Sequence, residues 1–213
     1  MTARTITLAA AKRDLDRVLK AAQEGPVSLT DRGRTVAVVT LALSMAQVIL
    51  EERLYNEPFV KEQTDLPLLV REDTRKFLRQ RDLKKGGAED VLYAFDLKSR
   101  RIQEMPRSSL RLKGIDPALE GEYEVETLKG RVKVRPVFQI LKERLKEYTP
   151  EKASRIAGIH PEAIRRVARE MAKARAVANV TNQGFGKYYH GDLMERSILL
   201  LFALCGHFGK KGS

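Results

Sequence analysis

The sequence predicts a mixed α/β fold. A small β-α-β-β module is expected at residues 1–40, followed by a helix-rich α/β domain at residues 41–213. Two kinds of pattern carry this prediction. Short runs that alternate polar and apolar residues, typical of strands, occur near the N-terminus and again between residues 84 and 136, whereas apolar residues at helical spacing fill most of the remaining chain. The hydrophobic content of 43% over 213 residues is ordinary for a folded globular protein.

The first forty residues are predicted to follow the order strand, helix, strand, strand. Residues 5–8 alternate as a short strand does, and residues 9–23 place their apolar side chains on one helical face. Residues 27–30 are expected to form the second strand. A hairpin turn at Asp31-Arg32-Gly33, where the glycine is free to adopt a positive φ, then leads into a third strand at residues 34–40.

Helices and two strand pairs are predicted beyond Leu41. An amphipathic helix begins there and is broken by Asn56-Glu57-Pro58, after which a second short helix follows. The strand pairs are "VLYAFDLKSRRIQEM" and "GEYEVETLKGRVKVRP", each with turn residues near its centre. A further helix is expected from Pro136 to Glu147.

The last third of the chain is predicted to contain three helices. Thr149 is the expected N-cap of the first, Gly158 ends it, and His160 begins the second. Residues 176–180 are expected to form a short buried strand, followed by a glycine-containing loop and an apolar helix. A strand, a glycine loop and a helix in this order form the phosphate- or nucleotide-facing corner of an α/β fold. The apolar helix carries Cys205, which is expected to be a core residue and not a ligand.

Composition narrows the classes of function. The net charge of +12 favours anionic partners such as nucleic acid or an acidic protein surface, and its plain alternative is a solvated basic surface. A single cysteine excludes an internal disulfide framework, a thiolate zinc cluster and a four-cysteine iron–sulfur site, and it suits a cytoplasmic protein. The N-terminus lacks the apolar core of a signal peptide. The longest apolar stretch, residues 198–205, is far too short for a membrane span.

Two stretches of the N-terminal module, "ITLAAAKRDLDRVL" and "GPVSLTDRGRTVAVV", resemble the Phd/YefM family of antitoxins, the DNA-binding half of bacterial toxin–antitoxin pairs. The resemblance implies a homodimer that binds DNA and a toxin, with phosphate contacts from basic side chains. The candidate DNA-binding residues are Arg4, Lys12, Arg13, Arg32 and Arg34. The alternative is a small scaffold whose basic side chains only face water.

Three later blocks, "LALSMAQVILEERLYNEPFVKEQTDLPLLVR", "YTPEKASRIAGIHPEAIRRVAREMA" and "GFGKYYHGDLMERSILLLFALCGHFGKKGS", resemble in order an internal segment of the molybdopterin oxidoreductases, the dimethyl-sulfoxide-reductase superfamily. Large subunits of that family bind a molybdenum or tungsten bis-pyranopterin guanine dinucleotide. The resemblance implies cofactor-binding residues in the loop before the last helix, namely Gly184, Lys187, Tyr188, His190 and Gly191. The alternative is a loop held only for its turn geometry.

Departures from this family shape two functional hypotheses. The regions that carry its metal ligand, its iron–sulfur cysteines and its later pterin-binding domain have no counterpart here, so the domain is expected to be incomplete. The first hypothesis is therefore a partial or split molybdopterin-dependent oxidoreductase catalytic subunit joined to an antitoxin-like head. It is not catalytic alone, carries no catalytic or metal-binding residue, and has the remaining oxidoreductase subunit or segment as its partner. The second is a Phd/YefM-type DNA-binding autoregulator with an oxidoreductase-derived tail.

Overall fold

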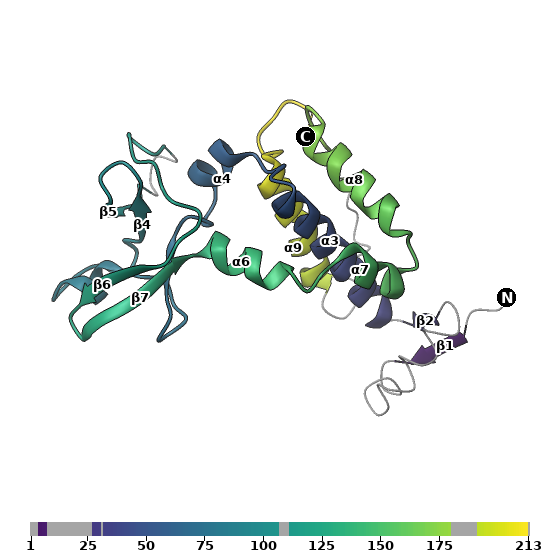
Figure 1. The fold of residues 1–213 in the computed structure, drawn as a ribbon, viewed down its shortest axis with the longest axis horizontal. Coiled ribbons are helices and arrows are strands. Elements are labelled where there is room, and N and C mark those ends of the chain that lie inside the picture. Colours follow the sequence, from purple (N-terminus) through teal and green to yellow (C-terminus); the bar gives the residue numbers. More distant parts are fainter. Residues whose placement is uncertain (1–3, 8–26, 31, 107–110, 180–190, 213) are drawn as a thin grey trace. The chain divides into compact units, whose positions relative to one another are not determined.

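The computed structural model describes residues 4–7, 27–30, 32–106, 111–179 and 191–212 (Figure 1). The chain is mixed helix and sheet, as predicted. It divides into two compact units. Unit 1 combines Met1–Tyr55 with Leu145–Ser213, and unit 2 comprises Asn56–Arg144.

Unit 1 is built around one long helix, α3 (Arg32–Glu51), which contacts α7 (Pro150–Ala157), α8 (Pro161–Lys173) and α9 (Gly191–Cys205) (Figure 1). From residue 40 onward most of its residues are buried: Thr40, Ala42, Ser44, Met45, Ala46, Val48, Ile49 and Leu50. A helix that is apolar on most of its sides needs neighbours on most of its sides. The helix predicted after Leu41 is present as part of α3. It was expected to bury one face only, and instead it is buried on most of its sides.

Two of the three strands predicted in the first forty residues are confirmed to within one residue. β1 (Arg4–Thr7) pairs in parallel with β2 (Val27–Thr30), and Arg4 lies opposite Val27. The helix predicted at residues 9–23 lies outside the described residues.

The predicted hairpin and third strand are wrong, because residues 34–40 belong to α3. Three valines at positions 36, 38 and 39 favour a strand by propensity. The apolar run continues without a turn residue to Leu50, however, and burial of its later part against other helices overrides that local preference. The change from strand to helix expected at residues 40 and 41 falls inside this continuous helix.

Local signals correctly locate α7 and α8. Thr149 caps α7 by accepting a hydrogen bond from the backbone N–H of Lys152 at 3.3 Å, and Gly158 ends the helix at a φ of 71°. The Nδ1 atom of His160 accepts from the backbone N–H of Glu162, so His160 is the N-cap of α8.

The strand expected at residues 176–180 is not formed by its described part, residues 176–179. These residues are half-buried or exposed, and none of them pairs with a described strand. A short apolar run without a neighbouring strand to share its hydrogen bonds does not form a strand.

Unit 2 contains a three-stranded antiparallel sheet and a separate hairpin. The sheet has the order β3-β7-β6, and β4 pairs with β5 in the hairpin. Both strand pairs expected from the sequence are confirmed. Its elements are α4 (Glu57–Gln63), β3 (Leu69–Arg71), α5 (Gln80–Leu83), β4 (Tyr93–Asp96), β5 (Arg101–Glu104), β6 (Tyr123–Thr127), β7 (Gly130–Pro136) and α6 (Val137–Leu145), whose last residue belongs to unit 1.

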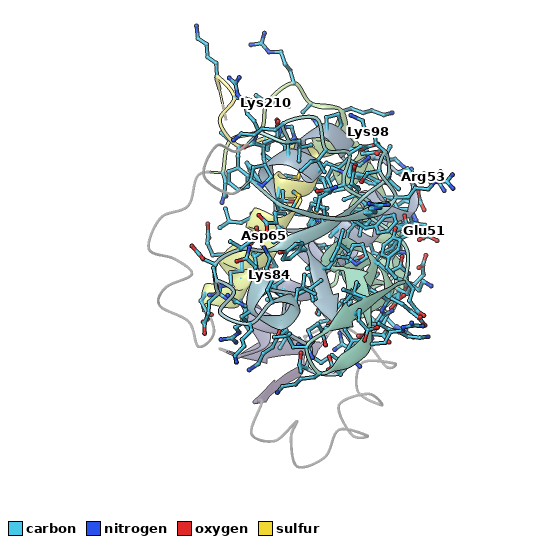
Figure 2. All side chains as sticks on the ribbon, turned by 90° about the vertical axis from the view of Figure 1, so that its left-hand side faces the viewer. Glu51, Arg53, Asp65, Lys84, Lys98 and Lys210 are labelled. Atoms are coloured by element: carbon cyan, nitrogen blue, oxygen red, sulfur yellow. The ribbon has the colours of Figure 1, made fainter. Side chains whose placement is uncertain are left out.

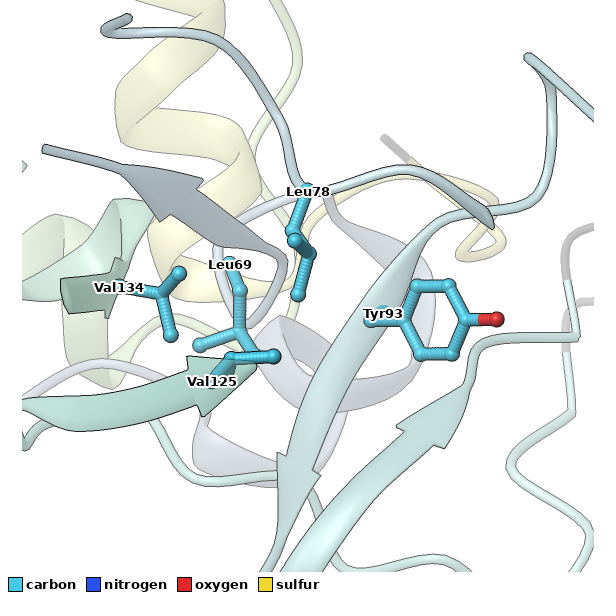
Figure 3. Packing of buried hydrophobic residues seen from close by; sticks show 5 residues of the cluster. All are labelled: Leu69, Leu78, Tyr93, Val125 and Val134. Atoms are coloured by element: carbon cyan, nitrogen blue, oxygen red, sulfur yellow. The ribbon is translucent and has the colours of Figure 1, made fainter. Parts of the chain in front are cut away.

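The sheet and the hairpin of unit 2 share one apolar core. Leu69, Leu78, Tyr93, Val125 and Val134 are all buried in this cluster, and they come from four strands and the segment between β3 and α5 (Figure 3). Phe95 and Tyr123, whose ring centroids are 3.7 Å apart, stack at the edge of the same cluster. This shared core joins the sheet and the hairpin within unit 2.

Candidate cofactor-facing site

The loop that carries the predicted cofactor-binding residues precedes α9. Gly184, Lys187, Tyr188 and His190 lie outside the described residues. The fifth, Gly191, is the first residue of α9 and is buried. The structure therefore places one of the five predicted residues, at the N-terminal end of a fifteen-residue helix.

Burial of its apolar side chains packs α9 into unit 1. Met194 and Leu204 are fully buried, and the buried Ser197 hydroxyl donates to the Met194 carbonyl at 2.7 Å. Burial raises the pKa of Cys205 to about 11, so its thiol stays protonated at neutral pH. The expectation that Cys205 is a core residue is confirmed.

The segment before the loop is tied to the first turns of α9. The Asn179 side chain donates to the Glu195 carboxylate at 3.3 Å. Ala176 lies beside the C-terminal turn, because a Cβ atom placed on Gly212 would come within 3.8 Å of the Ala176 Cβ. Of the described residues on the two sides of the loop, Asn179 thus contacts α9 and Gly191 belongs to it.

A glycine-rich turn follows α9 and is anchored by a histidine that the sequence reasoning missed. His207 is 1% exposed, and its Nε2 atom lies 2.9 Å from the Met171 carbonyl oxygen of α8. Its backbone N–H donates to the Phe202 carbonyl, which closes the end of α9. Gly206 and Gly209 adopt φ values of 68° and 72°, a backbone conformation that residues with a side chain adopt only with strain. The spacing of these glycines signals a turn, but the sequence does not show that His207 is buried.

The electrostatics at the start of α9 are mixed. A helix N-terminus attracts anions through its free N–H groups and its dipole, and a glycine there allows a ligand to approach the backbone closely. Asp192 in the first turn opposes a second negative charge. Across residues 32–106, 111–179 and 191–212, no cluster of His, Cys, Asp and Glu could hold a metal ion. This site can present a small backbone edge to an anionic group.

The residues predicted to bind DNA are placed only in part. Arg4 lies in β1, Arg32 and Arg34 lie in the first turn of α3 instead of in a hairpin, and Lys12 and Arg13 are outside the described residues. Charged side chains project from each unit, as Arg53, Lys98 and Lys210 illustrate (Figure 2). The basic character of the chain is therefore not confined to the first forty residues.

Comparison with known proteins supports one of the two resemblances. No protein-family model matches the chain. The chain is 39% identical over 199 residues to perchlorate reductase subunit alpha of Dechloromonas aromatica, an alignment that covers 81% of this chain and 22% of that protein. It is also 39% identical to dimethylsulfide dehydrogenase subunit alpha of Rhodovulum sulfidophilum and to respiratory nitrate reductase subunit alpha of Haloferax mediterranei, again over 81% of this chain and over 19% of each relative.

These relatives are catalytic subunits of molybdopterin oxidoreductases. Most of this chain is therefore homologous to one segment of such a subunit, and the chain spans about a fifth of the length of these relatives. The resemblance of residues 1–40 to Phd/YefM antitoxins finds no support in the comparisons. No helix within the described residues is long and apolar enough to cross a lipid bilayer.

Proposed function

We propose that this chain acts as part of a catalytic subunit of a molybdopterin-dependent oxidoreductase, where it holds an edge of the guanine dinucleotide cofactor. The observation that carries this proposal is the 39% identity over 81% of the chain to the alpha subunits of oxidoreductases. The chain spans about a fifth of those subunits, so the remaining segments or subunits of the oxidoreductase are its proposed partners.

The described residues fit this role in one respect. A buried glycine begins α9, a long helix whose N-terminus suits a phosphate group. Gly191 would hold the edge of the cofactor together with four residues that are predicted from the sequence alone, namely Gly184, Lys187, Tyr188 and His190. Lys187 would neutralise phosphate charge, and the glycines would let the ligand approach the backbone. The bound cofactor supplies the electron-transfer chemistry, and the residues of this chain bind and orient it.

Cofactor retention in cells tests the proposal. The full chain is produced in a bacterium that makes the guanine dinucleotide cofactor, and pterin is quantified by its fluorescence after oxidation. Pterin is expected to co-purify with the chain and to fall at least about tenfold in Lys187→Ala, the loss expected for one charge-assisted contact. The matched control is Lys146→Ala, because Lys146 is an exposed lysine elsewhere in unit 1. Pterin absent from the wild-type protein, or equal in both variants, would contradict the proposal.

The antitoxin-like alternative now rests on the net charge of +12 and on two short parallel strands. The hairpin that carried part of the resemblance is replaced by α3. DNA binding, a toxin partner, a homodimer and a cytoplasmic location remain predictions. A DNA shift by the full chain that weakens steeply with salt, and weakens further in Arg13→Ala, would favour this alternative.

A further inference from the structure

A pocket of about 540 Å³ lies wholly within unit 2 and shares no residue with the α9 site. Its lining comes from three segments: the turn after β3, the start of α5, and the turn between β6 and β7. We propose that this pocket binds a small molecule through a phosphate group. The proposal is independent of the molybdopterin assignment.

Backbone hydrogen bonds hold the three segments in place. The Arg71 N–H donates to the Lys76 carbonyl at 2.9 Å, which closes the turn after β3. The Leu128 N–H donates to the Asp82 carbonyl at 2.9 Å, which joins the β6–β7 turn to α5. The walls are therefore preorganised, and a ligand does not have to spend binding energy on ordering them.

Positive charge dominates the lining, and its two carboxylates are already engaged. The Arg71 side chain, 8% exposed, pairs with Asp73 through Nε at 3.0 Å and Nη2 at 2.7 Å, and with Asp82 through Nη1 at 2.7 Å. These hydrogen bonds lower the pKa of Asp73. Both acidic groups of the pocket therefore pair with Arg71, and Asp82 also accepts a hydrogen bond from the Arg79 backbone N–H at 2.9 Å.

The other cations of the pocket are less compensated. Arg81 pairs with Glu89, whereas the Arg79 guanidinium donates to a backbone carbonyl, that of Glu89. Within the part of the chain that the structure describes, the cationic side chains of Lys76, Arg79 and Lys129 have no carboxylate partner. Three such charges over one concavity create a positive potential, and a phosphate dianion offers three oxygens to match them.

The size and the apolar edge of the pocket favour a phosphate ester over the bare ion. Pockets for small organic ligands usually enclose about 300–1,000 Å³, far more than one phosphate group fills. Phe77 and Leu128, the latter 57% exposed, give the lining an apolar portion beside the cations. The organic part of an ester can pack against Phe77 and Leu128 while its phosphate group pairs with the lysines.

Titration of the full, ¹⁵N-labelled chain with inorganic phosphate and separately with adenosine 5′-monophosphate tests the inference. Saturable amide shifts are expected at residues 71–82 and 127–130. Affinity should fall at least about tenfold in the double variant Lys76→Gln/Lys129→Gln, because each lost charge-assisted hydrogen bond costs about that factor. Lys85→Gln is the control, since Lys85 is exposed in unit 2 and does not line the pocket.

The relative affinities for the nucleotide and for inorganic phosphate identify the ligand. Tighter binding of the nucleotide supports an ester as the source of the phosphate group, and equal or exclusive binding of inorganic phosphate supports the free ion. No saturable shift at these residues with either probe would overturn the inference. An equal loss of affinity in Lys85→Gln would overturn it too, because binding would then follow net charge and not this pocket.

Discussion

At the residue scale, Asp96 shows how one carboxylate can organise a turn. It is 6% exposed and accepts hydrogen bonds from the backbone N–H groups of Lys98 at 3.3 Å, Ser99 at 3.0 Å and Asp116 at 2.8 Å. These bonds favour the charged form and lower the pKa of Asp96, with the Asp116 contact contributing most. The carboxylate therefore joins the β4–β5 turn to the segment around Asp116.

This carboxylate makes acid stability a test of the structure. The pKa of Asp96 is lower in the folded chain than in the unfolded chain, where it is about 4. The carboxylate therefore stabilises the folded chain fully above that pH, and this stabilisation is lost as the pH falls below it. Asp96→Asn should lower the free energy of unfolding at pH 7, and its difference from wild type should shrink below pH of about 4. Denaturant melts at several pH values measure this. Asp90→Asn, at an exposed position, is the control. A difference that is independent of pH would contradict the account.

Core packing in unit 2 gives a second prediction for a single residue. Leu69 is fully buried among Leu78, Val125 and Val134, so Leu69→Ala leaves a cavity and should cost about 2–5 kcal/mol of unfolding free energy. Leu97→Ala, at a side chain that is 46% exposed, should cost less than about 1 kcal/mol. Chemical denaturation of both variants provides the comparison. Equal losses would show that Leu69 does not lie in a packed core.

At the scale of the element, the sequence correctly predicted the helices and strands whose ends are determined by nearby residues. Thr149, Gly158 and His160 identify α7 and α8 because caps act within one turn, and the two hairpins follow from alternation around polar turns. The start of α3 was not predictable in this way. Its β-branched residues favour a strand, and only contacts with helices more than a hundred residues later favour a helix.

The same limit applies to the sites. The glycine loop before α9 could be identified because its residues are consecutive in sequence. The basic pocket of unit 2 was missed, because Lys76 and Lys129 come from different turns and only the fold brings them to one cavity. The run "VREDTRKFLRQRDLKK" shows many cations, but not which of them converge.

The continuity of α3 can be tested with one substitution. Thr40 is 6% exposed within the helix, where proline would remove a backbone hydrogen bond and clash with the preceding turn. Thr40→Pro should therefore destabilise unit 1 by about 3 kcal/mol or more. Thr40→Ala keeps the backbone donor and should cost less. The free energy of unfolding measures both effects. A proline that is tolerated as well as alanine would restore the predicted break between a strand and a helix near this position.

At the scale of the whole molecule, the chain is expected to show no turnover alone. It spans about a fifth of the oxidoreductase subunits that it resembles, and its single cysteine cannot supply the four cysteine ligands of an iron–sulfur cluster. The full chain, given the molybdenum cofactor, a reduced dye and nitrate, should leave the dye reduced. The measurement is dye absorbance over time. Steady oxidation of the dye that Lys187→Ala abolishes would contradict this expectation and would make the chain an enzyme by itself.

The central claim is that the loop and helix around Gly191 contact the guanine dinucleotide, and hydrogen–deuterium exchange tests it most directly. The full chain is mixed with molybdopterin guanine dinucleotide, and exchange is compared peptide by peptide. The account predicts slower exchange in the peptide covering residues 184–195, lost in Lys187→Ala, with no change across the β4–β5 hairpin of unit 2. Unchanged exchange at residues 184–195 under saturating cofactor would contradict the account.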